Sequence, residues 1–241
     1  MPSMRRFFDD QDFHLDRPCQ LGASPSQHIA RVLRMSKGEE VVLFNGRGGE
    51  WRARLVAVDK KTVEVLPLAH DPVERTPPLA VTLGLPMIKG ERMDYAIQKA
   101  TELGVARIQI LDTARCEVRL KGERQEKKRE HWRQVAISAC EQCGLNRPPE
   151  ILTAMPLNSW LAGPLPGLKL IAHPGSEPFS RHRLTAQSEL TLLTGPEGGF
   201  DDDELESAFD AGFSAFALGS RVLRAETAPV ALLAALWAWL S

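Results

Sequence analysis

Apolar and polar positions along the first 70 residues alternate in short runs typical of β-strands. An apolar run at Glu40–Phe44 ends at the turn dipeptide Asn45-Gly46. Residues 51–55 alternate apolar side chains with arginines, and residues 62–66 repeat the alternation with two valines. Residues 26–34 show helical spacing instead. Short strands at this spacing predict a small β-barrel with one helix.

The pattern changes after residue 78. Residues 71–78 contain three prolines among charged side chains, which is a linker composition. Beyond them, apolar strands alternate with helical patterns, which indicates an α/β domain with a mostly parallel sheet. The predicted strands are 80–85, 107–111, 168–172, 190–193 and 213–218, and the predicted helices are 91–103, 124–143, 203–211 and 229–240. We therefore expect a barrel domain at 1–70, a linker at 71–78 and an α/β domain at 79–241.

Two loops of the α/β domain are candidates for ligand binding. Residues 194–199 (TGPEGG) and 219–224 (GSRVLR) each follow a strand, and ligands of open α/β sheets bind beyond the carboxyl ends of strands. Neither loop fits a phosphate cradle, because the chain lacks GxGxxG and GxxxxGK[ST] motifs, and four carboxylates follow the first loop at 201–204. A ligand with an adenine, a ribose and a cation, such as S-adenosylmethionine, fits better. The alternative is that TGPEGG is only a tight turn between strand and helix.

Charge is unevenly distributed, although the formal net charge is only −1. Residues 115–133 hold eight Lys or Arg against four Glu, whereas residues 189–219 hold eight Asp or Glu and no Lys or Arg. A basic face for nucleic acid can therefore coexist with an acidic one, although both could simply be solvated helix faces.

Cysteine usage and hydropathy exclude several classes of protein. Cys140 and Cys143 form a CxxC pair, but no second pair supplies zinc ligands and the pattern around them is helical, so structural thiols are favoured and no metal is expected. The longest apolar run, 228–240, has 13 residues and is too short to cross a bilayer. With no signal peptide visible, a cytoplasmic protein is expected.

Six segments together resemble a known family. They are RRFF at 5–8, HIARVLR at 28–34, KGERMDYAIQKATELGV at 89–105, ACEQCGLNRPPEI at 139–151, LLTGPEGGF at 192–200 and LGSRVLRAETAP at 218–229. In this order, over nearly the whole chain, they resemble the ribosomal RNA small subunit methyltransferase E family. One position departs from the family pattern: Leu145 stands where Arg is usual, which removes a possible RNA contact.

The resemblance implies a fold and an activity. It implies a PUA-like β-barrel followed by a SPOUT-type α/β methyltransferase domain with a trefoil knot, a rare exception to the rule that chains avoid knots. The implied reaction is methylation of N3 of one uridine in 16S ribosomal RNA by a homodimer that uses S-adenosyl-L-methionine. The implied cofactor contacts are His173, Pro174, Leu193, Thr194, Gly195, Pro196, Glu197, Gly198, Gly199, Leu218, Gly219, Ser220, Arg221, Val222, Leu223 and Arg224.

Further residues are candidates for chemistry and for RNA contact. N3 of uracil carries a proton, so a base must remove it, and a cation would stabilise the developing anion. Arg224 or Arg147 could be the cation, and Glu226 is the preferred base over Glu141 and Glu197, although Glu226 could equally cap the last helix. The RNA-binding candidates are Arg5, Arg6, Arg31, Arg34, Lys89, Lys99, Arg115, Asn146 and Arg147.

Two other functions remain open from the sequence. One is a SPOUT enzyme that acts on transfer RNA or on another ribosomal position, because its cofactor motifs would look much the same. The other is a non-enzymatic RNA-binding assembly protein with a PUA-like module. Binding of S-adenosylmethionine separates the second alternative from both enzymes.

Overall fold

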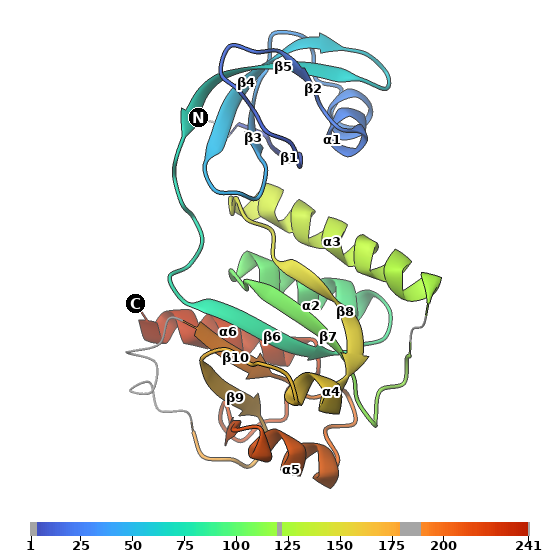
Figure 1. Ribbon diagram of the computed structural model, residues 1–241, viewed down its shortest axis with the longest axis vertical. Helices are drawn as coiled ribbons and strands as arrows, with labels where there is room; N and C mark the ends of the chain where they lie inside the picture. The colour runs from blue at the N-terminus through green and yellow to red at the C-terminus, as the bar shows by residue number, and fades with distance from the viewer. Residues whose placement is uncertain (1–3, 120–121, 179–188, 241) are drawn as a thin grey trace. The chain divides into compact units, whose positions relative to one another are not determined.

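The chain forms two compact units in the computed structural model, which describes residues 4–119, 122–178 and 189–240 (Figure 1). The first unit contains residues 4–76 together with Cys140–Pro148. The second contains the described residues of 77–139 and those from Pro149 onward. The first unit thus includes a distant segment of the chain, which local sequence patterns did not indicate.

A five-stranded sheet with the order β1-β3-β4-β5-β2 forms the first unit. Strand β1 runs parallel to β3, and the other neighbours are antiparallel. The inward side chains of these strands, among them Leu43, Leu55 and Val65, form one fully buried core. The strands are β1 (Arg6–Phe8), β2 (Cys19–Gln20), β3 (Glu40–Phe44), β4 (Glu50–Val58) and β5 (Val63–Asp71).

The single helix predicted at 26–34 is divided in two. Helix α1 (Ala23–Gln27) continues into one π-helical segment, η1 (His28–Val32). In η1 the N–H of Leu33 donates to the carbonyl of His28 at 3.0 Å, a wider turn than in an α-helix. Arg34 then has a φ of 50°, which ends the segment. The predicted region is helical, but its second half has a different turn.

The second unit is built on a six-stranded sheet with the order β11-β9-β10-β6-β7-β8, and every neighbouring pair is parallel. All five predicted strands are present, which confirms the predicted parallel α/β domain. The strands are β6 (Ala80–Pro86), β7 (Arg107–Asp112), β8 (Glu150–Pro156), β9 (Leu168–Ala172), β10 (Glu189–Leu193) and β11 (Ser214–Phe216).

Helices cover both faces of this sheet (Figure 1). One core joins buried strand residues such as Leu83 to residues of α2, α3 and α6, including Ile97, Trp132 and Leu233. The opposite face packs against α4 and α5 through Trp160 and other apolar residues. The helices are α2 (Glu91–Glu102), α3 (Glu123–Cys143), α4 (Leu157–Leu161), α5 (Asp202–Asp210) and α6 (Thr227–Leu240).

Candidate functional site

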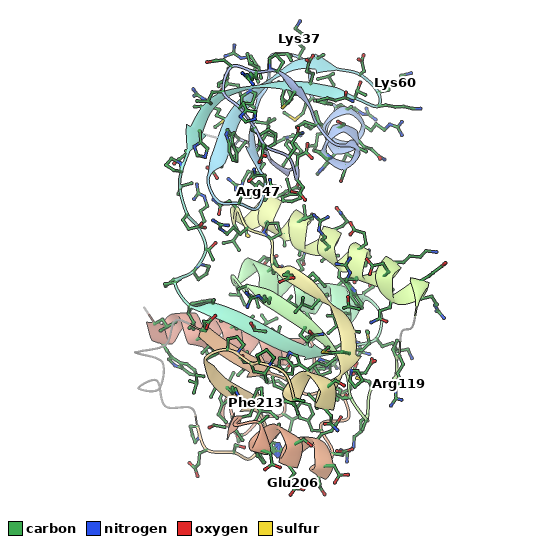
Figure 2. The ribbon with its side chains drawn as sticks, viewed as in Figure 1. Lys37, Arg47, Lys60, Arg119, Glu206 and Phe213 are labelled. Atoms are coloured by element: carbon green, nitrogen blue, oxygen red, sulfur yellow. The ribbon has the colours of Figure 1, made fainter. Side chains whose placement is uncertain are left out.

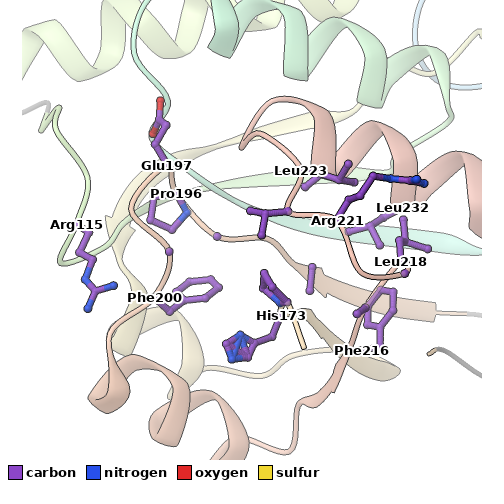
Figure 3. Close-up of a pocket in the computed structure, with 18 residues that line it drawn as sticks. Arg115, His173, Pro196, Glu197, Phe200, Phe216, Leu218, Arg221, Leu223 and Leu232 are labelled. Atoms are coloured by element: carbon purple, nitrogen blue, oxygen red, sulfur yellow. The ribbon is translucent and has the colours of Figure 1, made fainter. Parts of the chain in front are cut away.

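Three neighbouring strands, β11, β9 and β10, end at one edge of the parallel sheet. His173 follows β9, the 194–199 loop follows β10, and the 217–224 loop follows β11. A cavity of about 340 Å³ lies between these segments (Figure 3), which is large enough for a small-molecule ligand. The cavity is therefore formed where the two loops predicted from the sequence meet.

The wall of the cavity is mostly apolar, with a few charged or polar groups. A flat, uncharged ring such as adenine suits the apolar part of such a wall, and the polar groups can orient a ligand. The apolar side chains include Pro196, Phe200, Phe216, Leu218, Leu223 and Leu232. The charged or polar side chains are Arg115, His173, Glu197 and Arg221.

The 194–199 loop begins in the core and then turns sharply. Thr194 is fully buried, and its N–H donates to the carbonyl of Gly84 at 3.2 Å. Gly199 has a φ of 69°, and its N–H closes a turn on the carbonyl of Pro196 at 3.0 Å. A side chain at Gly199 would be strained in this conformation. The loop is thus a tight turn and also one wall of the cavity.

The carboxylates after this loop start helix α5. Asp201 is the N-cap, and its carboxylate accepts from the N–H of Glu204 at 2.8 Å. Glu204 in turn accepts from the N–H of Asp201 at 3.1 Å, which completes a capping box. These acidic side chains therefore stabilise a helix end beside the cavity.

Two arginines from other segments bind the glycine-rich loop. A guanidinium nitrogen of Arg92 lies 3.3 Å from a carboxylate oxygen of Glu197. Arg115 donates to the carbonyl of Gly198 at 2.9 Å. The loop is consequently held from two sides by side chains that are remote in the sequence.

The 217–224 loop is more exposed. Gly219 has a φ of 78°, and Val222 is 77% exposed at the cavity rim. The carbonyl of Arg224 accepts from the N–H groups of Thr227 and Ala228, both at 2.9 Å, so the backbone itself starts helix α6. Arg224 itself is exposed to solvent.

Glu226 is buried beside this loop. It is 9% exposed, and its Oε2 atom has no hydrogen-bond partner among the described residues. A buried oxygen without a partner is unfavourable and calls for a functional or structural explanation. Glu226 does not line the cavity itself.

Most of the predicted cofactor residues line the cavity, and five do not. Five predicted residues are not part of the lining: Leu193, Thr194, Gly198, Ser220 and Arg224. Six lining residues had not been predicted for any site: Ala172, Phe200, Phe216, Ala217, Ala228 and Leu232. Their positions offered only a weak signal in the sequence. Ala172 and Phe216 end strands, and Ala217 directly follows one. Phe200 ends the TGPEGGF segment, and Ala228 and Leu232 lie four residues apart on helix α6.

Three of the predicted RNA-binding arginines are exposed on the first unit. Arg5, Arg31 and Arg34 are all solvent-accessible. Arg31 donates to the carbonyl of Lys60 at 3.1 Å, so helix η1 contacts the loop after β4. Lys37 and Lys60 also extend outward from this unit (Figure 2). The region thus presents several cations to solvent.

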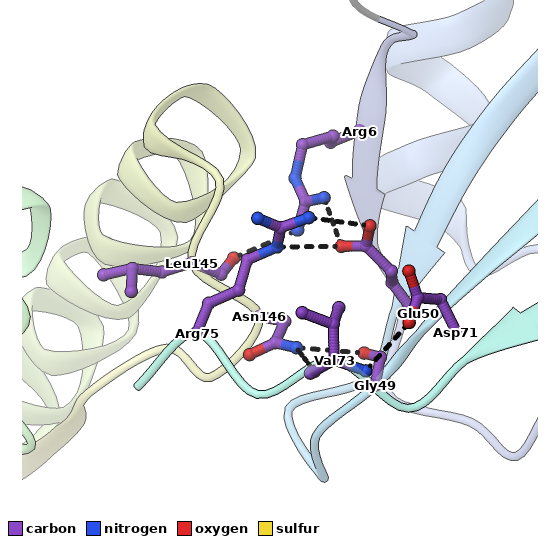
Figure 4. A network of polar contacts seen from close by, with 8 residues as sticks. All are labelled: Arg6, Gly49, Glu50, Asp71, Val73, Arg75, Leu145 and Asn146. Carbon is purple, nitrogen blue, oxygen red and sulfur yellow. Dashed lines mark hydrogen bonds and ion pairs between the residues drawn. The ribbon is translucent and has the colours of Figure 1, made fainter. Parts of the chain in front are cut away.

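Two other RNA candidates are part of an internal polar network (Figure 4). Arg6 is paired with Glu50 and donates to the carbonyl of Leu145 at 3.3 Å. Asn146 is fully buried and donates to the carbonyls of Gly49 and Val73 at 3.3 and 2.8 Å. Side chains held in this way stabilise the first unit, and RNA contact by Asn146 would require them to rearrange. Leu145, the departure from the family pattern, contributes its backbone carbonyl.

Three further cationic candidates, Arg147, Lys89 and Lys99, have acidic neighbours. Arg147 donates to Glu74 at 2.8 Å and to the carbonyl of Gly46 at 3.3 Å. Burial raises the pKa of Glu74, but hydrogen bonds from Thr76 and Arg147 outweigh this effect and lower that pKa to about 2. Ion pairs also join Lys89 to Glu117 and Lys99 to Glu102.

The CxxC cysteines lie in helix α3, Cys140 buried and Cys143 exposed, and both are free thiols. Burial raises the pKa of the Cys140 thiol well above its usual range. Within the described part of the chain, no group of three or more His, Cys, Asp or Glu residues could hold a metal ion. No helix among these same residues has the length and apolar character to span a bilayer.

Comparison with known proteins relates this geometry to a family. The RNA methyltransferase domain family matches residues 75–237, and the RNA methyltransferase PUA domain family matches residues 26–68. The ribosomal RNA small subunit methyltransferase E of Buchnera aphidicola (strain Sg) is 32% identical over 92% of this chain and 91% of its own length. The Bacillus subtilis protein of the same name is 31% identical over 87% of this chain and 85% of its own. The chain belongs to the ribosomal RNA small subunit methyltransferase E family.

Solved structures agree with this assignment. A Legionella pneumophila protein in complex with the bound cofactor SAM has a TM-score of 0.95 and 38% identity, over 98% of both chains. The Neisseria gonorrhoeae ribosomal RNA small subunit methyltransferase E bound to S-adenosyl methionine has a TM-score of 0.90 and 34% identity, again over 98% of both chains. The predicted fold class, a SPOUT-type methyltransferase domain after a small PUA-like barrel, is confirmed. The protein is thus an RNA methyltransferase of the ribosomal RNA small subunit methyltransferase E family.

Proposed function

We propose that this protein transfers the methyl group of S-adenosylmethionine to N3 of one uridine in 16S ribosomal RNA. The observation that carries the proposal is the cavity at the ends of β9, β10 and β11, in a chain 34–38% identical to proteins solved with this cofactor. We further propose that the protein acts in the cytoplasm as a homodimer, as the family resemblance implies.

The cavity residues fit this cofactor. An apolar wall that includes Leu218, Leu223 and Leu232 suits adenine. The cavity volume of about 340 Å³ is at the lower end of the range for ligand sites, which suits a bent ligand. When bound, S-adenosylmethionine supplies an electrophilic methyl group on its sulfonium. The residues of the two loops would hold that methyl group in line with the attacking nitrogen.

The reaction also requires removal of the N3 proton and stabilisation of the negative charge that develops on the uracil. We assign proton removal from N3 to Glu226, because its buried carboxylate has an oxygen without a partner beside the second cofactor loop. We assign stabilisation of the uracil anion to Arg224, which is exposed at the end of that loop. Arg147 is the weaker candidate, because its guanidinium already binds Glu74 within the first unit.

The substitution Glu226→Gln tests the proposed base. We expect turnover to fall about 100-fold with an unchanged dissociation constant for S-adenosylmethionine, because the amide cannot accept the proton. Single-turnover methylation of 16S ribosomal RNA and calorimetry measure the two quantities. Glu206→Gln, an exposed change on helix α5, is the matched control and should keep full activity. Full turnover in Glu226→Gln would show that the base lies elsewhere.

We propose that the first unit binds the RNA through the exposed cations Arg5, Arg31 and Arg34. Lys89, Lys99 and Arg115 on the second unit remain candidates for the same role. Reaching N3 requires the uridine to leave its stack, so the flanking RNA must be held firmly. Phosphate contacts by several arginines would supply such binding without reading the sequence.

Reversing both Arg31 and Arg34 to Glu should weaken RNA binding at least about ten-fold and reduce its salt dependence, because phosphate contacts are lost. The affinity for S-adenosylmethionine should stay unchanged. Filter binding over a series of salt concentrations measures both RNA effects. The control pair Arg52→Glu and Arg54→Glu makes the same change of net charge on strand β4, where both arginines are paired with Glu40. Equal losses in the two double variants would mean that net charge, not this surface, governs binding.

The target base is tested in cells. We expect 16S ribosomal RNA from a strain without this gene to lack one N3-methyluridine, and expression of the protein to restore it. Nucleoside analysis by mass spectrometry detects the difference. A missing methyl group on transfer RNA, or on another ribosomal atom, would assign the protein a different substrate.

A further inference from the structure

The segment after strand β7 is bonded to the start of helix α5 by one buried carboxylate. Glu204 is 7% exposed, and each of its oxygens accepts a backbone N–H. Oε2 accepts from Asp201 at 3.1 Å, which completes the capping box, whereas Oε1 accepts from Ala114 at 2.7 Å. A capping box needs only the first bond. The bond to Ala114 therefore serves another purpose.

The next residue, Arg115, reaches the cofactor loop itself. It lines the cavity, and its guanidinium donates to the carbonyl of Gly198 at 2.9 Å. Its stem also lies against the loop, since a Cβ atom at Gly198 would approach the Arg115 Cβ to 3.0 Å. In Figure 3, Arg115 stands beside the loop that carries Pro196 and Glu197. The contact leaves room only for glycine at position 198 without a shift.

These contacts form one continuous connection. Glu204 holds the N–H of Ala114, Ala114 precedes Arg115, and Arg115 holds the carbonyl of Gly198. The loop at 194–199 contains three glycines, so by itself it would lose much conformational entropy on binding a ligand. Bonds that order the loop beforehand reduce this loss and raise affinity.

We propose that Glu204 is a positioning residue that orders the cofactor loop through Ala114 and Arg115, and thereby sets the affinity for the cofactor. The proposal rests on the proposed function, because it takes the ligand of the cavity to be S-adenosylmethionine. A carboxylate is needed because both of its oxygens accept N–H groups, whereas an amide has one acceptor and would direct an NH₂ group at a donor.

The substitution Glu204→Gln tests this role. We expect the dissociation constant for S-adenosylmethionine, measured by calorimetry, to rise about ten-fold, because a buried N–H loses its acceptor. Arg115→Met should have an effect of similar size. Combining the two should add little beyond either single change, since both break the same connection. Additive effects of the two substitutions on binding would overturn the proposal.

The control Asp201→Ala separates loop ordering from helix capping. It removes the acceptor for the N–H of Glu204 but leaves the bond to Ala114 intact. If Glu204 only capped helix α5, Glu204→Gln and Asp201→Ala would lower the melting temperature to similar extents, and neither would change cofactor affinity. We expect Asp201→Ala to change the dissociation constant for S-adenosylmethionine less than about two-fold, which is a difference in binding free energy smaller than RT.

Hydrogen exchange in the ligand-free protein gives a readout that does not depend on the cofactor. Amides of residues 194–200 should exchange faster in Glu204→Gln than in the wild type or in Asp201→Ala. Unchanged exchange in a folded Glu204→Gln protein would overturn the proposal. If the wild type failed to bind S-adenosylmethionine, the proposed function would fall, and the exchange data would still decide whether Glu204 orders the loop.

Discussion

Replacing Ala217 by Trp is expected to abolish binding of S-adenosylmethionine while the protein remains folded. Ala217 lies directly after strand β11 and lines the cavity of about 340 Å³. An indole ring at this position would fill much of the cavity that we propose for the cofactor. We expect the dissociation constant to rise at least about 100-fold, which corresponds to about 3 kcal/mol. Calorimetry with the purified protein measures the loss.

A second alanine provides the control for this substitution. Ala162 is an exposed residue at the end of helix α4, in the same unit, and does not line the cavity. Ala162→Trp adds the same ring and should leave cofactor affinity unchanged. Wild-type affinity in a folded Ala217→Trp protein would mean that the cofactor binds outside this cavity.

Replacing Gly84 by Ala is expected to destabilise the second unit, because the strand β6 backbone has no room for a methyl group there. A Cβ atom at Gly84 would lie 2.6 Å from the Trp160 ring and 3.1 Å from the side chain of Leu111. Overpacking of this kind lowers the free energy of unfolding by about 1–3 kcal/mol. Urea denaturation monitored by tryptophan fluorescence measures the loss.

The cause can be isolated with a second substitution. Trp160→Leu frees space over Gly84, so adding it to Gly84→Ala should lower stability by less than the sum of the two single losses. The single Trp160→Leu variant measures the loss of the ring itself and is the reference for the double variant. Strict additivity in the double variant would show that the Trp160 contact is not the source of the loss.

Sequence patterns predicted five interior strands closely, whereas the interior strands β4 and β5 continue past the predicted runs 51–55 and 62–66. Strands β3 and β9 have the predicted bounds, and β6, β7 and β10 differ from the prediction by one residue. These strands are buried on both faces or at the centre of a sheet, so their residues form unbroken apolar or alternating runs.

Elements at the edges were missed for a physical reason. Strand β8 pairs only with β7 at the edge of its sheet, and three of its seven residues are half-buried while three are exposed, so its sequence EILTAMP carries little periodicity. Strands β1 and β2 have three and two residues, too few for any pattern to be seen. The turn of η1 was also unpredictable, because its five residues make only about one turn, too few for an α-helical period to be told from a π-helical one.

The sequence predicted the two loops of the candidate site and, through the family resemblance, His173 and Pro174, but not the other residues that line the cavity. The glycines of TGPEGGF and the following acidic run marked a strand end that could accept a ligand without phosphate. Phe216, Ala228 and Leu232 are ordinary core residues in the sequence, and only folding brings them to the same cavity. The roles of Arg6 and Asn146 were equally hidden, since their partners Glu50, Gly49 and Val73 are far away along the chain.

The sequence by itself determined the two kinds of domain, the parallel α/β sheet, the two loops and, through six matching segments, the family. Those features depend on local periodicity, turn chemistry and motif order, all of which can be read along the chain. Only the tertiary structure decided which residues share the cavity, that Cys140–Pro148 belongs to the first unit, and that Glu204 reaches Ala114. Each of these depends on contacts between positions that are distant in the sequence. The role of one buried carboxylate or one glycine is set by a contact partner that no local pattern specifies.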